Sequence, residues 1–125
     1  KLRGGPGMSS PVASGNYIYV CSRGFLSCYN TKTGQEAYKS RLPSSKSIAA
    51  SMWADDKHVF LMDESGKAYV VKAGPEFKIV GENDLDDLFW STPAVTKGTL
   101  LLRGANKLYC IREKKPLPNC EILGP

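Results

Sequence analysis

The sequence predicts an all-β fold made of about three similar four-stranded antiparallel sheets. The first observation is an internal repeat, because Pro11, Met52 and Pro93 open similar stretches and are spaced by 41 residues. The second is the pattern inside each copy, where β-branched and aromatic runs alternate with turns of Gly, Asn, Asp and Ser. The third is the lack of a comparably long helical period. A short helix over residues 83–88 is the less favoured interpretation of that segment.

Each copy repeats the same order of elements. A short apolar segment comes first, then a β-branched and aromatic run, then a hairpin turn in which Gly supplies a positive φ. The predicted hairpin turns lie at residues 23–24, 64–66 and 104–106. We expect an outer strand over residues 36–42 in the first copy and around residues 77–80 in the second. The approximate units are 8–43, 48–86 and 90–123, within one domain, 1–125.

A period near 41 with four antiparallel strands is the size of a β-propeller blade. One such sheet cannot bury both of its apolar faces alone, so blades stack around an axis. A β-sandwich is the alternative, but the regular period argues against it. Three blades form only a partial propeller with uncovered faces and edges. We therefore expect the remainder of a longer propeller, a protein partner or self-association to complete the ring, for example two half-rings in a dimer.

The third copy lacks a recognisable outer strand after its second long strand. Residues 120–123, or the short stretch 1–3, could supply that strand, and the sequence does not choose between them. Because strands at the edge of a sheet are prone to pair with other chains, this edge matters for the state of the protein in solution.

The first copy resembles the PQQ-like β-propeller repeat of quinoprotein dehydrogenases and of many non-catalytic bacterial proteins. Its stretch GFLSCYNTKTGQEAY is similar to the family pattern Gly-x-Leu-x-x-Leu-Asp-x-x-Thr-Gly-x-x-x-Trp. The matching residues are Gly24, Leu26, Tyr29, Asn30, Thr33, Gly34 and Tyr38. Tyr38 stands where the family has Trp, and the second copy keeps only Gly66 and Gly74 clearly. The resemblance covers residues 8–112 and implies a periplasmic or secreted location.

The resemblance leaves two functions open, because one fold hosts many activities. Quinoprotein dehydrogenases hold their cofactor with a vicinal disulfide, a Ca²⁺ site and a general-base Asp, and this chain has no adjacent cysteine pair. We therefore expect a non-catalytic scaffold or protein-interaction module with no cofactor and no catalytic residue. The alternative is a fragment of a PQQ-dependent alcohol or sugar dehydrogenase, which would bind PQQ and Ca²⁺.

Composition limits other classes of function. The chain has no apolar run of the length that spans a membrane as a helix. Its net charge of +5 comes from scattered basic residues, so we expect no nucleic-acid partner. The four cysteines form no CxxC pair and His58 is the only histidine, so no metal site is predicted.

Cys21 and Cys28 are predicted to be free thiols. A two-residue turn at residues 23–24 places Cys21 opposite Leu26 and Cys28 opposite Tyr19, so the two thiols are not cross-strand partners. Whether Cys110 and Cys120 form a disulfide stays open.

The candidate binding contacts lie where each inner strand begins, at one predicted mouth of the central channel. They are Trp90, Ser91, Thr92, Ser9, Ser10 and Ser51. Trp90 is the best single candidate, because its counterparts Met8 and Ala49 are smaller, although packing between blades would also explain it.

Other conspicuous residues receive structural interpretations. Trp53 is interpreted as a filler between blades, and the acidic pairs 55–56 and 63–64 as turn residues. The acidic stretch 81–90 could offer carboxylates to Ca²⁺, but it lacks the EF-hand pattern and is interpreted as a solvated connection.

Overall fold

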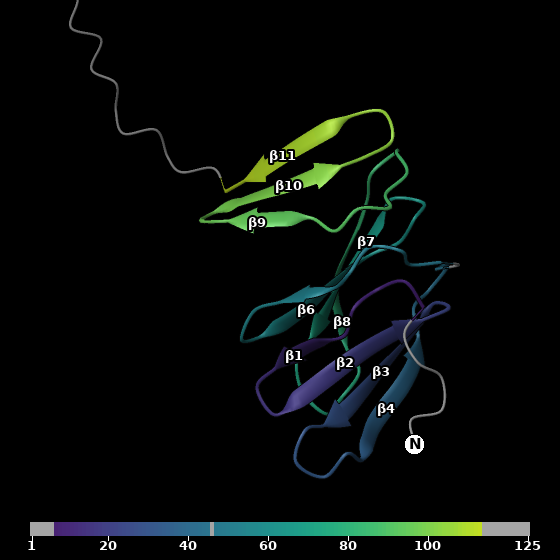
Figure 1. The fold of residues 1–125 in the computed structure, drawn as a ribbon, viewed down its shortest axis with the longest axis vertical. Coiled ribbons are helices and arrows are strands. Elements are labelled where there is room, and N and C mark those ends of the chain that lie inside the picture. Colours follow the sequence, from purple (N-terminus) through teal and green to yellow (C-terminus); the bar gives the residue numbers. More distant parts are fainter. Residues whose placement is uncertain (1–6, 46, 114–125) are drawn as a thin grey trace, which may run out of the picture.

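The computed structural model describes residues 7–45 and 47–113, which form three antiparallel sheets in sequence order. The three sheets follow one another from the bottom to the top of Figure 1. The first sheet has the order β1 (Val12–Ser14), β2 (Tyr17–Ser22), β3 (Phe25–Asn30) and β4 (Glu36–Arg41). The second has β5 (Trp53–Ala54), β6 (His58–Met62), β7 (Lys67–Lys72) and β8 (Ile79–Asp84). The third has β9 (Ala94–Thr96), β10 (Thr99–Arg103) and β11 (Leu108–Arg112).

The all-β prediction is confirmed, since the described residues contain strands and turns but no helix. Within the same residues there is accordingly no helix that could cross a membrane. The strands fall inside the predicted units 8–43, 48–86 and 90–123, of which residues 114–123 lie outside the described part. The stretches 120–123 and 1–3, considered for the last outer strand, also lie outside it.

The outer strand of the second sheet differs from its prediction at residues 77–80, because β8 begins only at Ile79. The pairing of β7 with β8 shifts register between Val70 and Val71, so that Val71 pairs with Ile79. Phe77 lies before the strand and packs edge-to-face on Tyr38, with ring centroids 5.5 Å apart. The contact with the first sheet therefore takes Phe77 out of the strand that the sequence assigned to it.

The hairpin between β2 and β3 has the predicted register. Tyr19 pairs with Cys28 and Cys21 with Leu26. Arg23 and Gly24 have φ values of 51° and 77°, the combination that a two-residue turn needs to match the twist of its strands. Cys21 and Cys28 are free thiols, as predicted, and Cys110 is also free.

The core lies in the seams between successive sheets, with one apolar cluster in each seam. The first seam joins β2 and β3 to β6 and β7. Its buried members are Tyr19, Cys21, Leu26, Cys28, Leu42, Ile48, Met52, Val59, Leu61, Tyr69 and Val71. The second seam is smaller, with Met62, Phe89 and Leu102 as its buried members. Because the facing surfaces of successive sheets cover one another, stacking supplies burial that a single sheet cannot obtain alone.

The connection that follows the second sheet runs close over the hairpin turn at Gly66 and leaves no room there for a side chain. A Cβ on Gly66 would lie 1.9 Å from the Leu85 carbonyl oxygen, and Gly66 also has a φ of +99°. By contrast, Gly15 has a φ of +57° and no heavy atom within 4 Å of the corresponding Cβ position.

These two glycines separate backbone strain from steric exclusion. Gly15→Ala should lower the free energy of unfolding by about 1 kcal/mol, because alanine is disfavoured in the left-handed conformation. Gly66→Ala should lower the free energy of unfolding by more than about 2 kcal/mol, because the connection after β8 must also move away from the new methyl group. Chemical denaturation of both variants measures the difference, and equal losses of stability would contradict the close approach at Gly66.

Candidate functional site

Three of the candidate residues form a hydrogen-bonded ladder from sheet to sheet. The Ser10 N–H donates to Ser51 Oγ at 3.0 Å, and the Ser51 N–H donates to Thr92 Oγ1 at 3.0 Å. Both bonds join residues 41 positions apart, so the repeat places the same contact in both seams. The sequence predicted these residues as binding contacts, and the structure shows that Ser51 and Thr92 use their hydroxyls to join blades.

The other candidate residues lie apart from this ladder. Ser9 is buried, and its Oγ has no hydrogen-bond partner within the described ranges 7–45 and 47–113. Ser91 is exposed and its Oγ donates to the Arg103 carbonyl oxygen at 3.3 Å. Trp90 has 57% of its surface exposed. Its predicted role as a binding contact at a channel mouth stays a prediction.

Asp87 holds the connection before the third sheet against the hairpin of that sheet. Its carboxylate accepts hydrogen bonds from the Asn106 side chain at 3.0 Å, the Lys107 N–H at 3.2 Å and the Tyr109 hydroxyl at 3.3 Å. Asp87 is buried, so the interpretation of residues 81–90 as a solvated connection is wrong at this position. Asp84 and Asp86 are exposed, as that interpretation requires. No local pattern in the sequence reveals the difference, because the partners of Asp87 lie about twenty residues later in the chain.

Asp63 has a similar position in the second sheet. Its carboxylate accepts hydrogen bonds from Ser45 Oγ at 2.7 Å, in the preceding connection, and from the Ser65 N–H at 2.7 Å. The turn role predicted for residues 63–64 is confirmed. In addition, the bond from Ser45 ties the connection between sheets to the hairpin, a long-range contact that a turn pattern does not reveal.

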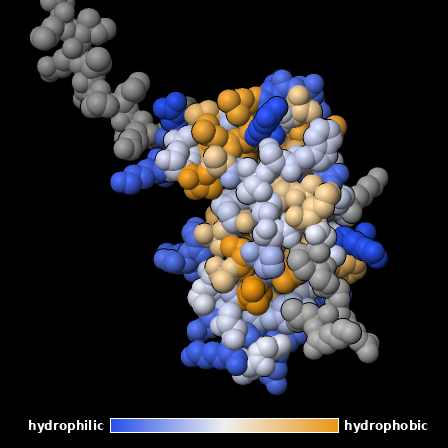
Figure 2. Space-filling model, viewed as in Figure 1, coloured by the Kyte–Doolittle hydropathy of each residue, from blue (hydrophilic) through white to orange (hydrophobic). Residues whose placement is uncertain are grey.

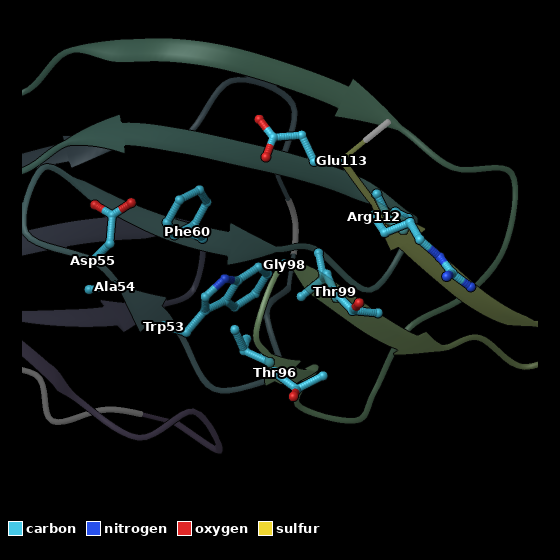
Figure 3. Close-up of a pocket in the computed structure, with 12 residues that line it drawn as sticks. Trp53, Ala54, Asp55, Phe60, Thr96, Gly98, Thr99, Arg112 and Glu113 are labelled. Carbon is cyan, nitrogen blue, oxygen red and sulfur yellow. The ribbon is translucent and has the colours of Figure 1, made fainter. Parts of the chain in front are cut away.

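A cavity of about 340 Å³ lies in the second seam. Trp53 and Phe60 are paired in the second sheet and stack there with centroids 5.5 Å apart. Trp53 also packs against the apolar cluster that includes Leu102 of the third sheet, in agreement with its interpretation as a filler between blades. Figure 3 shows Trp53 of this pair near Thr99 of the third sheet, whereas the Arg112 side chain is directed away from the pair. In the first seam the equivalent of Phe60 is Tyr19, whose hydroxyl accepts a hydrogen bond from the Gly74 N–H at 2.8 Å. Phe60 has no hydroxyl, so the second seam lacks this closure.

The thiols differ strongly in their surroundings. Burial raises the pKa of Cys21 to about 12, with a further contribution from the nearby Asp63 carboxylate. Burial also raises the pKa of Cys28 to about 11, although hydrogen bonds with Tyr19 and Tyr38 partly oppose it. Cys110 is exposed on β11. Since thiolates are the reactive species, only Cys110 among these three has the accessibility that modification needs.

No protein-family model and no curated protein matches this sequence. Solved structures do match the fold. BamB from Moraxella catarrhalis superposes with a TM-score of 0.66 at 16% identity, over 82% of this chain and 32% of that one. A europium-containing methanol dehydrogenase gives 0.62 at 15% identity, over 83% of this chain and 21% of that one. The quinohemoprotein alcohol dehydrogenase from Comamonas testosteroni gives a TM-score of 0.61 at 15% identity, over 78% of this chain and 17% of that one.

These similarities establish the fold of the chain. It is a partial β-propeller of the PQQ-like repeat, as the sequence predicted. The chain spans about a third of the length of BamB and about a fifth or less of the two dehydrogenases. Sequence identities near 15% establish only the fold, so any activity has to be argued from the functional residues of this chain.

The Asp87 contacts predict an acid-sensitive stability. Burial pushes the pKa of its carboxyl up, but hydrogen bonds from Leu88, Asn106 and Tyr109 outweigh burial and hold it below its ordinary value of 3.8. The stabilisation is therefore present above that value and is lost as pH falls through the lower pKa of the folded state. Asp87→Asn should lower Tm at pH 7 and flatten the acid limb of a Tm-against-pH curve. The exposed neighbour variant Asp86→Asn is the control, and an unchanged acid limb in Asp87→Asn would refute the assignment.

The thiol environments predict selective alkylation. Iodoacetamide at pH 8 should modify Cys110 in the folded protein and leave Cys21 and Cys28 unmodified until the chain unfolds. Peptide mapping by mass spectrometry, with and without denaturant, reads out each site separately. Rapid labelling of Cys28 in the native protein would show that the first seam opens.

Proposed function

We propose that the chain is a non-catalytic scaffold or protein-interaction module, and that it works outside the cytoplasm, in the periplasm or as a secreted protein. The observation that carries the proposal is the use of its polar groups. The hydroxyls of Ser51 and Thr92 and the carboxylates of Asp63 and Asp87 bind parts of the chain to one another. Groups that bind one part of the chain to another build a rigid surface, which is what a scaffold requires.

An uncovered sheet face supports an interaction role. On the face of the third blade opposite Leu102 and Tyr109, Leu108 has 72% of its surface exposed. Figure 2 shows apolar surface, in orange, over this blade at the top of the view. Exposed apolar patches of this kind mark interaction sites. We expect a protein partner or a second copy of the chain there, and no nucleic acid, because the basic residues are scattered.

The second candidate is a fragment of a PQQ-dependent alcohol or sugar dehydrogenase, favoured by the likeness to the alcohol and methanol dehydrogenases. Two observations on the described residues weigh against this second candidate. Asp63 and Asp87 already accept hydrogen bonds from their own hairpins. Within residues 7–45 and 47–113, no three His, Cys, Asp or Glu side chains gather closely enough to hold a metal ion.

Addition of PQQ with Ca²⁺ separates the two functions. A ligand that binds only the folded state, present at a hundred times its Kd, adds about 2.7 kcal/mol of stability. For a domain of this size such a gain raises Tm by roughly ten degrees or more. We expect no rise in differential scanning fluorimetry beyond the shift that Ca²⁺ alone gives. A saturable rise that requires PQQ would favour the dehydrogenase fragment.

A further inference from the structure

Three hydrogen bonds close the first seam near the end where β1 turns into β2. Ser14 Oγ donates to the Asp55 carbonyl oxygen at 2.8 Å. The Tyr19 hydroxyl accepts the Gly74 N–H at 2.8 Å, and Cys28 Sγ donates to the Gly74 carbonyl oxygen at 3.5 Å. All three side chains belong to the first blade, so the first blade itself holds the connections of the second blade against it.

The second blade lacks the groups that would close the second seam in the same way. The strand pairing sets the equivalent residues of the first and second blades, which are Ser14 and Asp55, Tyr19 and Phe60, Cys28 and Val70, and Tyr38 and Gly81. A carboxylate, a phenyl ring and an isopropyl group donate no hydrogen bond here, and a glycine adds no side-chain volume. The cavity of about 340 Å³ in the second seam therefore follows from side chains in the middle of the chain.

The walls of this cavity are aromatic and aliphatic. Trp53 and Phe60 stack with their ring planes 9° apart, and both remain partly exposed. Apolar residues of the third blade also line the cavity, namely Val95, Leu100 and Ile111. Accessible aromatic rings of this kind attract planar groups and cations through the charge distribution of the ring.

The rim of the cavity carries carboxylate oxygens without a cationic partner. Asp55 Oδ1 accepts hydrogen bonds from the Lys57 N–H at 2.8 Å and the His58 N–H at 2.6 Å, and His58 Nδ1 lies 3.4 Å from the same oxygen. Among the residues that the structure describes, no hydrogen bond or ion pair engages Asp55 Oδ2 or the Glu113 carboxylate. The Lys57 and His58 N–H groups lower the pKa of Asp55, although burial slightly opposes them, so this carboxylate is charged at neutral pH.

We propose that the cavity binds an arginine side chain of a protein partner, with the guanidinium group against the aromatic pair and bonded to the Asp55 carboxylate. The proposal rests on the proposed role as an interaction module and names the chemistry that its partner supplies. Figure 3 shows the carboxylates of Asp55 and Glu113 on either side of Phe60, whereas the Arg112 side chain is directed away.

The chemistry of arginine matches each part of the cavity. Its guanidinium group is planar and stacks on aromatic rings, and its fork of N–H donors fits a carboxylate, which the compact ammonium group of lysine does not. Its aliphatic stem can cover apolar surface while the charge stays at the rim. Because Asp55, Thr96 and Glu113 at the rim are exposed, the cavity suits a side chain that enters from another protein better than an enclosed small molecule.

A small arginine probe tests the site directly. N-acetyl-arginine amide supplies the side chain, and N-acetyl-citrulline amide is its neutral isostere. In a Trp90→Phe background Trp53 is the only tryptophan, so its fluorescence reports on the cavity. The arginine probe should change this fluorescence saturably at millimolar concentration, because the carboxylate lies at a solvated rim. At equal ionic strength the citrulline probe should bind about fivefold more weakly.

Two outcomes of this titration would overturn the proposal. Equal binding of the two probes would show that the charge is not recognised. No saturable change would show that the cavity does not take an arginine side chain, as expected if other residues of the chain or a second copy fill it.

A matched pair of variants assigns the charge that is recognised. Asp55→Asn keeps the Oδ1 acceptor of the turn, so it should fold normally, weaken the arginine probe about fivefold and leave the citrulline probe unchanged. Asp56→Asn, at the exposed neighbour outside the cavity, should change neither. Asp55→Ser introduces the residue of the first blade and should also remove the preference for arginine, with melting curves confirming that each variant folds. A preference that survives both substitutions of Asp55 would refute the site.

Amide chemical shifts locate the bound probe. Gly98 lines the cavity in the turn between β9 and β10, and Gly15 lies in the equivalent turn of the first blade. In ¹H–¹⁵N spectra the Gly98 peak should move with added arginine probe and the Gly15 peak should stay in place. Equal movement of both peaks would indicate non-specific binding and overturn the proposal.

The arginine and PQQ tests can fail separately. A protein that binds neither the arginine probe nor PQQ loses this site and keeps the scaffold role. A protein that binds both keeps the site and loses the non-catalytic role.

Discussion

Burial of one sheet face by the next sheet is the constraint on which the other features of this chain depend. Leu26 and Cys28 of the first blade and Val59 of the second are fully buried in one seam. A twisted sheet with two apolar faces has no other means of removing both from water, so the repeat must place complementary faces at a constant spacing. The bonds from the N–H groups of Ser10 and Ser51 follow from that spacing, since they appear only when successive blades hold one register.

The same constraint explains how the polar residues are used. The connection between two blades crosses the hairpins at the end of the sheets, and its backbone needs partners there. Asp63 and Asp87 provide them in the second and third blades, each bonded to both a turn and a connection or a neighbouring strand. In Asp87 the hydrogen bonds also hold the pKa of the carboxyl below its ordinary value, although burial opposes them. This use of acidic groups agrees with a scaffold, whose surface matters more than any reactive group.

Much of the fold could be predicted because its signals are local. The hairpin turn at Arg23 and Gly24, the pairing of Cys28 with Tyr19 and the outer strand of the first blade all depend on neighbours within about twenty residues. The second outer strand was misplaced because Phe77 packs on Tyr38 of another blade. Asp87 was misread for the same reason, since its donors come from a later hairpin. Of the candidate site, the sequence found Ser10, Ser51 and Thr92 by alignment but not their bonds.

The sequence by itself determined the period, the strand pattern and therefore the propeller repeat, because alternation of apolar residues and turn chemistry act over short distances. It also determined that Cys21 and Cys28 stay free. Only the tertiary structure decided what the hydroxyls at the start of each inner strand do, since their partners are 41 residues away in another sheet. The structure likewise decided which face of the third blade is left exposed, because burial depends on which sheet lies next to it.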